Sequence, residues 1–314
     1  MKTPPMQFLR DWALVIAITA GIAGYFIYIS IPWLEPTHAF ARQAVSVTQP
    51  ALIFAMLFLT FCRVDPHSLR PCRWQGWLLL IQGGSFALLA GISALVPSGA
   101  PRVLFEGAAL CMICPTATAA AVVTRKLGGD VAHVTSYTIL INLLTSLIVP
   151  AIVPFLHPHA DLDFIAAFLL ILGKVFPLLL MPLISAWLLR WLLPSLAHKI
   201  GNYSDLGFYL WAVALTLALA TTTRSVVHSS VGLPTQLMLV VVSLLCCAVQ
   251  FWSGKRIGRL YGDEITAGQA LGQKNTVLVI WMGYTFFTPV TAVVGGFYSI
   301  WHNLYNTYQL RHHK

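Results

Sequence analysis

The residues best able to do chemistry form a polar cluster inside an apolar stretch of the C-terminal half. Residues 268–276 read Gly-Gln-Ala-Leu-Gly-Gln-Lys-Asn-Thr, and Lys274 stands at the middle of the apolar segment 265–284. No Asp or Glu lies deep in any apolar segment of the chain, so this ammonium lacks an obvious carboxylate partner. A buried ammonium without a partner either gives up its proton or has its charge neutralised by a bound anion. The cluster therefore indicates proton transfer, anion binding or both.

A second cluster, at residues 114–121, reads Cys-Pro-Thr-Ala-Thr-Ala-Ala-Ala. Pro115 interrupts an apolar segment near its midpoint, as Gly272 does in the first cluster. A broken helix in lipid leaves backbone groups unpaired unless protein, water or a ligand satisfies them. Paired breaks predict a binding site; the alternative is that Pro115 only kinks a helix and Gly272 only packs against a neighbour. The candidate substrate-binding residues are Thr116, Thr118, Gln273, Lys274, Asn275 and Thr276.

Other polar residues within apolar segments each have two interpretations. Lys174 lies near the middle of the segment 164–189, where it either joins the anion site or extends its stem to a membrane interface. Thr138, with His133 and Asn142, either extends the polar surface or forms ordinary interhelical hydrogen bonds.

Two of the six cysteines, Cys111 and Cys114, form a C-x-x-C motif. In a redox protein such a motif is a thiol exchange centre. Here it falls in an apolar segment, and no quinone motif, His-Glu metal spacing or Ser/His/Asp set accompanies it. Packing of small residues between helices is favoured, so no catalytic residue, metal site or cofactor is predicted.

The elements that must position these residues are membrane spans. The chain is 58% hydrophobic and 9% charged, against about 25% charged for an ordinary soluble domain. Apolar stretches of about 20 residues recur, each long enough to cross a bilayer as a helix. We predict ten spans: 12–34, 45–61, 74–96, 104–124, 131–155, 164–189, 206–223, 233–252, 265–284 and 289–308.

The basic residues indicate the orientation of these spans. If the N-terminus is cytoplasmic, fourteen of the nineteen Lys and Arg residues fall in inside segments, and only Arg42, Arg102 and Arg224 fall outside. Bases scattered through short loops favour a lipid bilayer over nucleic acid as the partner. The first apolar run is too long for a secretory signal. We expect a multi-pass protein of a bacterial inner membrane, with both termini cytoplasmic.

Ten spans divide into two groups of five that enter the membrane from opposite sides, which is the plan of an inverted repeat. The fold class expected is therefore an all-α polytopic membrane protein in a 5+5 inverted repeat, with broken helices four and nine crossing. Polar interruptions are loop-length, so residues 1–314 form one membrane unit.

The span count, the Pro-Thr-Ala-Thr break running into the turn at 129–130, and the segment 269–275 together resemble the bile acid:sodium symporter family over nearly the whole chain. The resemblance implies a panel domain from about 11–62 and 164–225 and a core domain from about 74–156 and 232–309. It implies an organic anion as substrate, such as a bile acid, a pantothenate-like acid or a keto acid, taken up with sodium and bound beside the crossing.

The chain departs from that family where sodium is expected to bind. Ala120 and Ala121 stand where similar proteins have oxygen ligands, Gln269 where they have a glutamate, and Val134 where they have a hydroxyl. Sodium prefers several oxygen ligands, which alanine does not supply. Lys274 stands where the family has an asparagine, so we interpret it as an electrostatic replacement for the ion. Candidate ion-coupling residues are Lys274, Gln269 and Thr138.

The function expected is sodium-independent secondary transport of a small organic anion by alternating access, with possible proton coupling through Lys274. The alternatives are an intramembrane redox enzyme that uses Cys111 and Cys114, or a non-transporting sensor built on a transporter fold. The solute, the direction of transport and the oligomeric state are left open.

Overall fold

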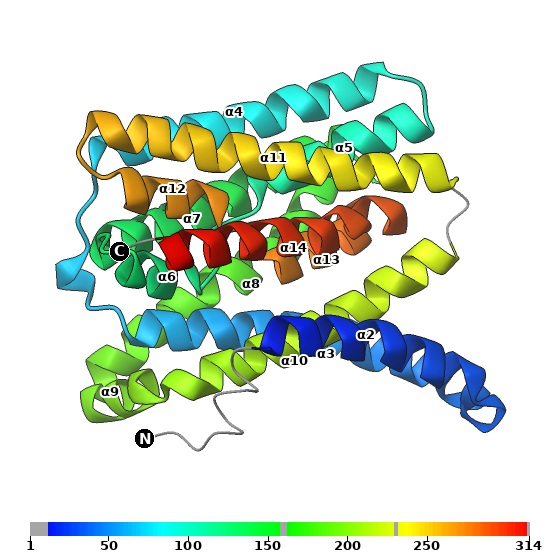
Figure 1. Ribbon diagram of the computed structural model, residues 1–314, viewed down its shortest axis with the longest axis horizontal. Coiled ribbons are helices and arrows are strands. Elements are labelled where there is room, and N and C mark those ends of the chain that lie inside the picture. The colour runs from blue at the N-terminus through cyan, green and yellow to red at the C-terminus, as the bar shows by residue number, and fades with distance from the viewer. Residues whose placement is uncertain (1–11, 158–161, 229–231, 313–314) are drawn as a thin grey trace.

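The structure is a computed structural model that describes residues 12–157, 162–228 and 232–312, and in these ranges it is a bundle of α-helices (Figure 1). Two short 3-10 turns, η1 (Pro32–Thr37) and η2 (Pro66–Ser68), join helices. In chain order the helices are α2 (Ala13–Ser30), α3 (His38–Cys62), α4 (Arg73–Leu95), α5 (Ala100–Ile113), α6 (Ala120–Lys126), α7 (Val131–Leu156), α8 (Phe164–Leu192), α9 (Pro194–Asn202), α10 (Ser204–Val227), α11 (Leu233–Leu260), α12 (Glu264–Gly272), α13 (Thr276–Phe286) and α14 (Pro289–His312).

Six helical stretches of the described residues are long and apolar enough to cross a membrane. They match six of the ten predicted spans, whereas the fourth and ninth predicted spans are each divided into two short helices. The count of ten stays a prediction. The six stretches are Pro32–Cys62, Arg73–Leu95, Val131–Leu156, Phe164–Leu192, Leu206–Val227 and Leu233–Leu260.

The first divided span ends early because of its proline. Pro115 disfavours helical geometry in the residue before it, and Cys114 accordingly has ψ 132° just after the end of α5. The chain becomes helical again only at Ala120, where α6 begins. The second divided span ends α12 at Gly272 and resumes at Thr276, with the Asn275 side chain accepting a hydrogen bond from the backbone N–H of Leu278 at 3.3 Å.

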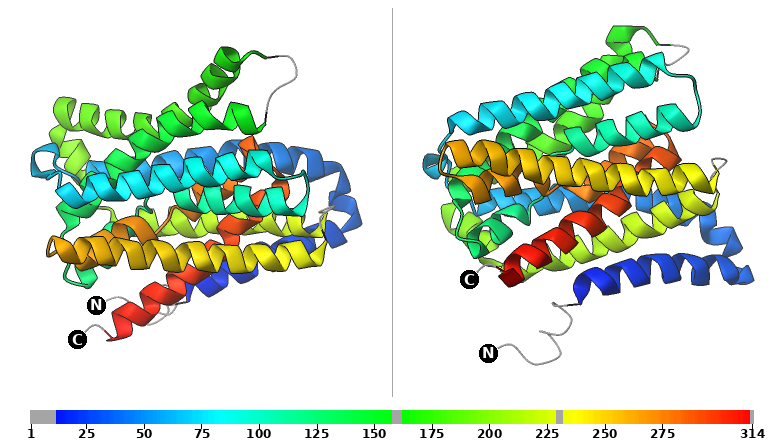
Figure 2. Two further views of the ribbon diagram at one scale, coloured as in Figure 1. Left: turned by 90° about the horizontal axis from the view of Figure 1, so that it is seen from above. Right: turned by 45° about the horizontal axis from the view of Figure 1, so that its top comes forward.

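The helices pack in two groups. In one, α2 packs on α10, and α3 packs on α8 and α10. In the other, α4 packs on α5, α11 on α12, and α13 on α14, while α7 and α8 join the groups. Figure 2 shows α2 at the edge of the bundle from two further directions. The boundaries of panel and core domains stay a prediction.

The closest helix pair, α11 and α12, meets through two glycine repeats. A Cβ added at Gly258 of α11 would lie 2.5 Å from the Asp263 carbonyl oxygen, and one added at Gly254 would lie 2.6 Å from the Ala267 oxygen. On α12, a Cβ at Gly272 would lie 2.4 Å from the ring of Phe251. Small residues spaced four apart let membrane helices approach this closely, so the short α12 is held firmly along α11.

Candidate functional site

The two breaks meet and pair through their backbones. Thr116 and Lys274 form an isolated antiparallel bridge. The Ala117 N–H donates to the Gln273 oxygen at 2.8 Å, and the Asn275 N–H donates to the Pro115 oxygen at 2.9 Å. Each interrupted helix thus satisfies backbone groups that the other interruption exposes, as a break inside a membrane requires.

Side chains from three neighbouring helices satisfy the carbonyl groups that α5 exposes at its C-terminal end. The Gln82 amide of α4 donates to the oxygens of Ile113 at 3.1 Å and Cys114 at 2.7 Å, and is itself held by the Tyr137 hydroxyl at 2.8 Å. From α7, Thr145 also donates to the Ile113 oxygen at 3.1 Å. Gln250 of α11 donates to the Cys111 oxygen at 3.2 Å.

Lys274 supplies the remaining donor at this helix end. Its side chain is 1% exposed, and its Nζ donates to the Met112 oxygen at 3.5 Å. No carboxylate lies within 4 Å of it among the residues that the structure describes. The partially negative C-terminus of α5 therefore lies next to the Lys274 amine.

The C-terminal end of α12 is satisfied in the same manner. Tyr298 of α14 donates to the Gly272 oxygen at 2.8 Å, and Thr116 donates to the Ala270 oxygen at 2.6 Å. Thr116 is fully buried, so its hydroxyl is committed to the protein and not to a solute. Gly272 ends α12 and also packs against the ring of Phe251, and its part in a binding site stays a prediction.

A cavity of about 40 Å³ lies beside the crossing, with room for little more than one water molecule. Residues just before α6 and at the start of α13 line it. The buried Gln273 Oε1 has no hydrogen-bond partner in the described part of the chain. No carboxylate lines the cavity, whose residues are Met56, Ala117, Thr118, Ala119, Trp211, Gln273, Lys274, Asn275, Thr276, Val277, His302 and Asn303.

A comparison with protein families adds to this geometry. The family model of the SBF-like CPA transporter family matches residues 22–311. The chain belongs to this family. The predicted likeness to bile acid:sodium symporters is thereby confirmed, and the protein is a multi-pass membrane protein of a transporter family. A search of curated proteins found no match.

A much larger cavity, of about 660 Å³, lies in this transporter between α2, α3, α10 and α13. Sequence reasoning did not identify it, because its residues come from four separate segments. Arg42 and Arg224 line it, together with His38 and His228, and no Asp or Glu does. Tyr25 bonds His228 at 2.9 Å across its wall. We call this space the outer cavity.

The positions predicted to have lost sodium ligands lie in an apolar environment. Ala120 and Val134 are fully buried in a cluster with Ala267, Ala270 and Leu271. The Tyr137 hydroxyl in that cluster donates to Gln82 at 2.8 Å. Among the described residues of this transporter, no group of three or more His, Cys, Asp and Glu is arranged to hold a metal ion.

Three further candidates lie away from the small cavity. Lys174 is exposed on α8 and lines neither cavity, which favours a lysine that reaches an interface; its place in the substrate site stays a prediction. Gln269 donates to Asn306 of α14 at 3.0 Å, and Thr138 donates within its own helix to the Val134 oxygen at 2.8 Å.

The C-x-x-C motif serves packing in this geometry. Cys111 and Cys114 are both fully buried in the main apolar cluster. The Cys114 thiol donates to the Asn275 oxygen at 3.0 Å, which fastens α5 to the second break. Thiol exchange needs an accessible sulfur, so this arrangement does not favour the redox alternative.

One carboxylate is deeper than the sequence indicated. Glu106, expected near a helix end, is 1% exposed inside α5. Arg102 bonds it at 3.0 Å, and His157 and Thr291 also contact it. These partners account for its burial, and the spacing of Arg102 and Glu106 by one helical turn is the signal that could have revealed the pair.

Proposed function

We propose that this protein is a secondary transporter of a small organic anion, that it works without sodium, and that Lys274 takes the place of the coupling ion. The observation that carries the proposal is the buried Lys274 ammonium at the crossing, beside a cavity that carboxylates do not line. A site with this charge favours an anion by electrostatics alone.

Both cavities support an anionic solute. Lys274 lines the small cavity, and two guanidinium groups line the outer cavity among apolar and aromatic side chains. Such a lining fits a solute with an acidic group and an apolar body. A volume of about 660 Å³ is within the ordinary range for small-molecule sites.

Both cavities lie along one boundary, between α13 on one side and α3 and α10 on the other, which we call the seam. Val277 lines the small cavity and Trp281 the outer one, one helical turn apart on α13. The opposite wall of both is formed by α3 and α10. In our proposal α2, α3, α8 and α10 form the panel, the remaining spans form the core, and the seam between them opens to alternate sides. The solute passes from Arg42 and Arg224 to the crossing.

The ten spans, the 5+5 inverted repeat, the cytoplasmic termini and the inner-membrane location are parts of the same proposal. The pairing of two similar breaks, in the fourth and ninth predicted spans, supports the repeat. The apolar setting of Ala120 and Val134 supports independence from sodium. Deprotonation of Lys274 in the empty carrier is the proposed route of proton coupling.

Uptake by proteoliposomes tests this function. Radiolabelled taurocholate, pantothenate and pyruvate are offered separately, with a sodium gradient, a choline gradient or an imposed pH gradient. We expect saturable uptake of at least one anion, equal in sodium and choline. A ten-fold dependence on sodium would contradict the ion-replacement idea, and uptake of cations in preference to all anions would contradict the transporter as proposed.

A further inference from the structure

A groove of about 360 Å³ runs between α11 and α14, on a different face from both cavities of the transport path. The side chains that line the groove change from apolar to aromatic to basic along α11. The part near Leu244 is apolar, Trp252 and Tyr305 follow, and basic side chains end it. Residues 244–259 extend over about 22 Å of helix. The lining consists of Leu244, Cys247, Ala248, Phe251, Trp252, Lys255, Arg256, Arg259, Glu264, Trp301 and Tyr305.

At the basic end of the groove, two of the three basic side chains have no carboxylate partner among the described residues. Arg259 binds both oxygens of Glu264, at 2.9 Å and 2.7 Å, and this guanidinium holds the pKa of the Glu264 carboxyl below its usual value. Lys255 lies over the ring of Tyr305, 5.2 Å from its centre, and Arg256 is exposed. Within the described ranges neither Lys255 nor Arg256 has a carboxylate within 4 Å.

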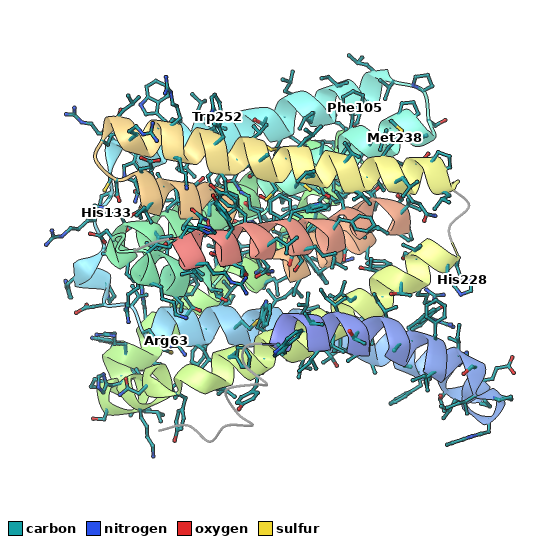
Figure 3. The ribbon with its side chains drawn as sticks, viewed as in Figure 1. Arg63, Phe105, His133, His228, Met238 and Trp252 are labelled. Atoms are coloured by element: carbon teal, nitrogen blue, oxygen red, sulfur yellow. The ribbon has the colours of Figure 1, made fainter. Side chains whose placement is uncertain are left out.

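The rest of the groove faces the surroundings of the bundle. Trp252 is 68% exposed, and Leu244, about two helical turns away, is also exposed. Figure 3 labels Trp252 toward the end of α11 that leads into α12, and Met238 toward its opposite end. In a membrane protein such a face is covered by lipid, and an aromatic residue next to basic residues is typical of the level of the headgroups.

From this geometry we propose that the groove is a binding site for one anionic phospholipid. The headgroup phosphate lies on Lys255 and Arg256, and one acyl chain follows the apolar part toward Leu244. Basic pockets between membrane helices bind acidic headgroups in this way. A zwitterionic lipid gains less, because its own cation meets the same two charges. Free phosphate uses the basic end only and leaves the apolar part unoccupied.

The site adjoins the residues that position the second break. The ring of Phe251, on the groove wall, also closes over Gly272, and the stem of Lys255 packs against Gly268. A lipid in the groove therefore contacts the two side chains that hold α12 against α11. The proposal is independent of the solute and of the transport mechanism.

Native mass spectrometry of the purified protein tests the site. Phosphatidylglycerol and phosphatidylcholine of equal chain length are offered in competition. We expect retention of phosphatidylglycerol at least five-fold over phosphatidylcholine, and a loss of about ten-fold or more in the double variant Lys255→Gln/Arg256→Gln. The matched control, Arg125→Gln/Lys126→Gln, removes two exposed bases on α6 outside the groove and should retain the lipid as the native protein does.

A second pair of variants tests the apolar part and does not depend on charge. Ala248→Phe fills the groove and should lose the lipid, whereas Val249→Phe, next to it and outside the lining, should not. Inorganic phosphate is tested by its effect on the thermal unfolding midpoint. The proposal is overturned if the two headgroups are retained equally, if Lys255→Gln/Arg256→Gln or Ala248→Phe leaves retention unchanged, or if phosphate alone stabilises as much as phosphatidylglycerol.

Discussion

Thr116 and Lys274 stand opposite each other in an antiparallel bridge at the point where two interrupted helices cross. The bridge brings the Lys274 side chain under the C-terminal end of α5, where its Nζ reaches the Met112 oxygen. A cation there stabilises the helix end, and the same cation borders the small cavity. One side chain thus contacts the end of α5 and borders the small cavity, and in our proposal it sets the charge selectivity of that cavity.

Replacement of Lys274 by Met should remove most anion affinity while keeping the fold. The charge-assisted hydrogen bond to a solute is worth about 1.5–3 kcal/mol, so the dissociation constant should rise about ten-fold or more. Binding to purified protein and uptake at several pH values measure this. Lys174→Met is the matched control, because Lys174 is exposed and lines neither cavity. An equal loss of anion affinity in Lys274→Met and Lys174→Met would contradict the proposed role of Lys274 in anion binding.

Arg224→Gln and Arg42→Gln should weaken capture of the anion from solution. Both guanidinium groups line the outer cavity and are exposed, so their effect is partly screened and we expect a KM increase of about three- to ten-fold with little change in maximal rate. The increase should shrink at high salt. Arg311→Gln, on α14 outside this cavity, is the control. An unchanged KM would exclude the outer cavity from the path.

Gln82→Leu should destabilise the crossing. The variant has similar volume but leaves the buried Cys114 oxygen without its donor and the Tyr137 hydroxyl without its acceptor, while the Ile113 oxygen keeps only the bond from Thr145. The expected cost is about 1–3 kcal/mol, seen as a lower thermal unfolding midpoint in detergent. Gln43→Leu, an exposed glutamine on α3, should leave the midpoint unchanged. Similar midpoints for both variants would mean that these oxygens find other donors.

Gly258→Ala should disturb the contact of α11 with α12. The added Cβ would lie 2.5 Å from the Asp263 oxygen and 2.6 Å from the Ala267 Cβ, so the helices must separate, at a cost of about 1–3 kcal/mol. The same change at Gly173 of α8 meets nothing within 4 Å and should be neutral or slightly stabilising. Thermal unfolding of the two variants compares them directly, and a Gly258→Ala midpoint at or above that of Gly173→Ala would contradict the close packing.

The location of the two breaks was predictable from local chemistry. A proline in a helix removes a donor and displaces its predecessor, and Pro115 stands at the first break. Proline alone does not decide a break, because α3, α7 and α8 continue through prolines of their own. A lysine at bilayer depth is costly wherever it occurs, so Lys274 could be singled out without a structure. Hydrophobicity likewise predicted a multi-pass helical protein. Each span must be long and apolar enough to cross the bilayer and must satisfy its own backbone groups, so it can be identified without knowledge of the other spans.

What the tertiary structure decided was which residues meet. Lys174 and Lys274 look alike in the sequence, but α8 turns the first outward and the crossing encloses the second. The outer cavity joins Arg42 and Arg224 from distant segments, which no local pattern reveals. Depth in the membrane follows from sequence position, whereas the direction of a side chain around a helix and the partners it meets depend on how that helix packs against the others.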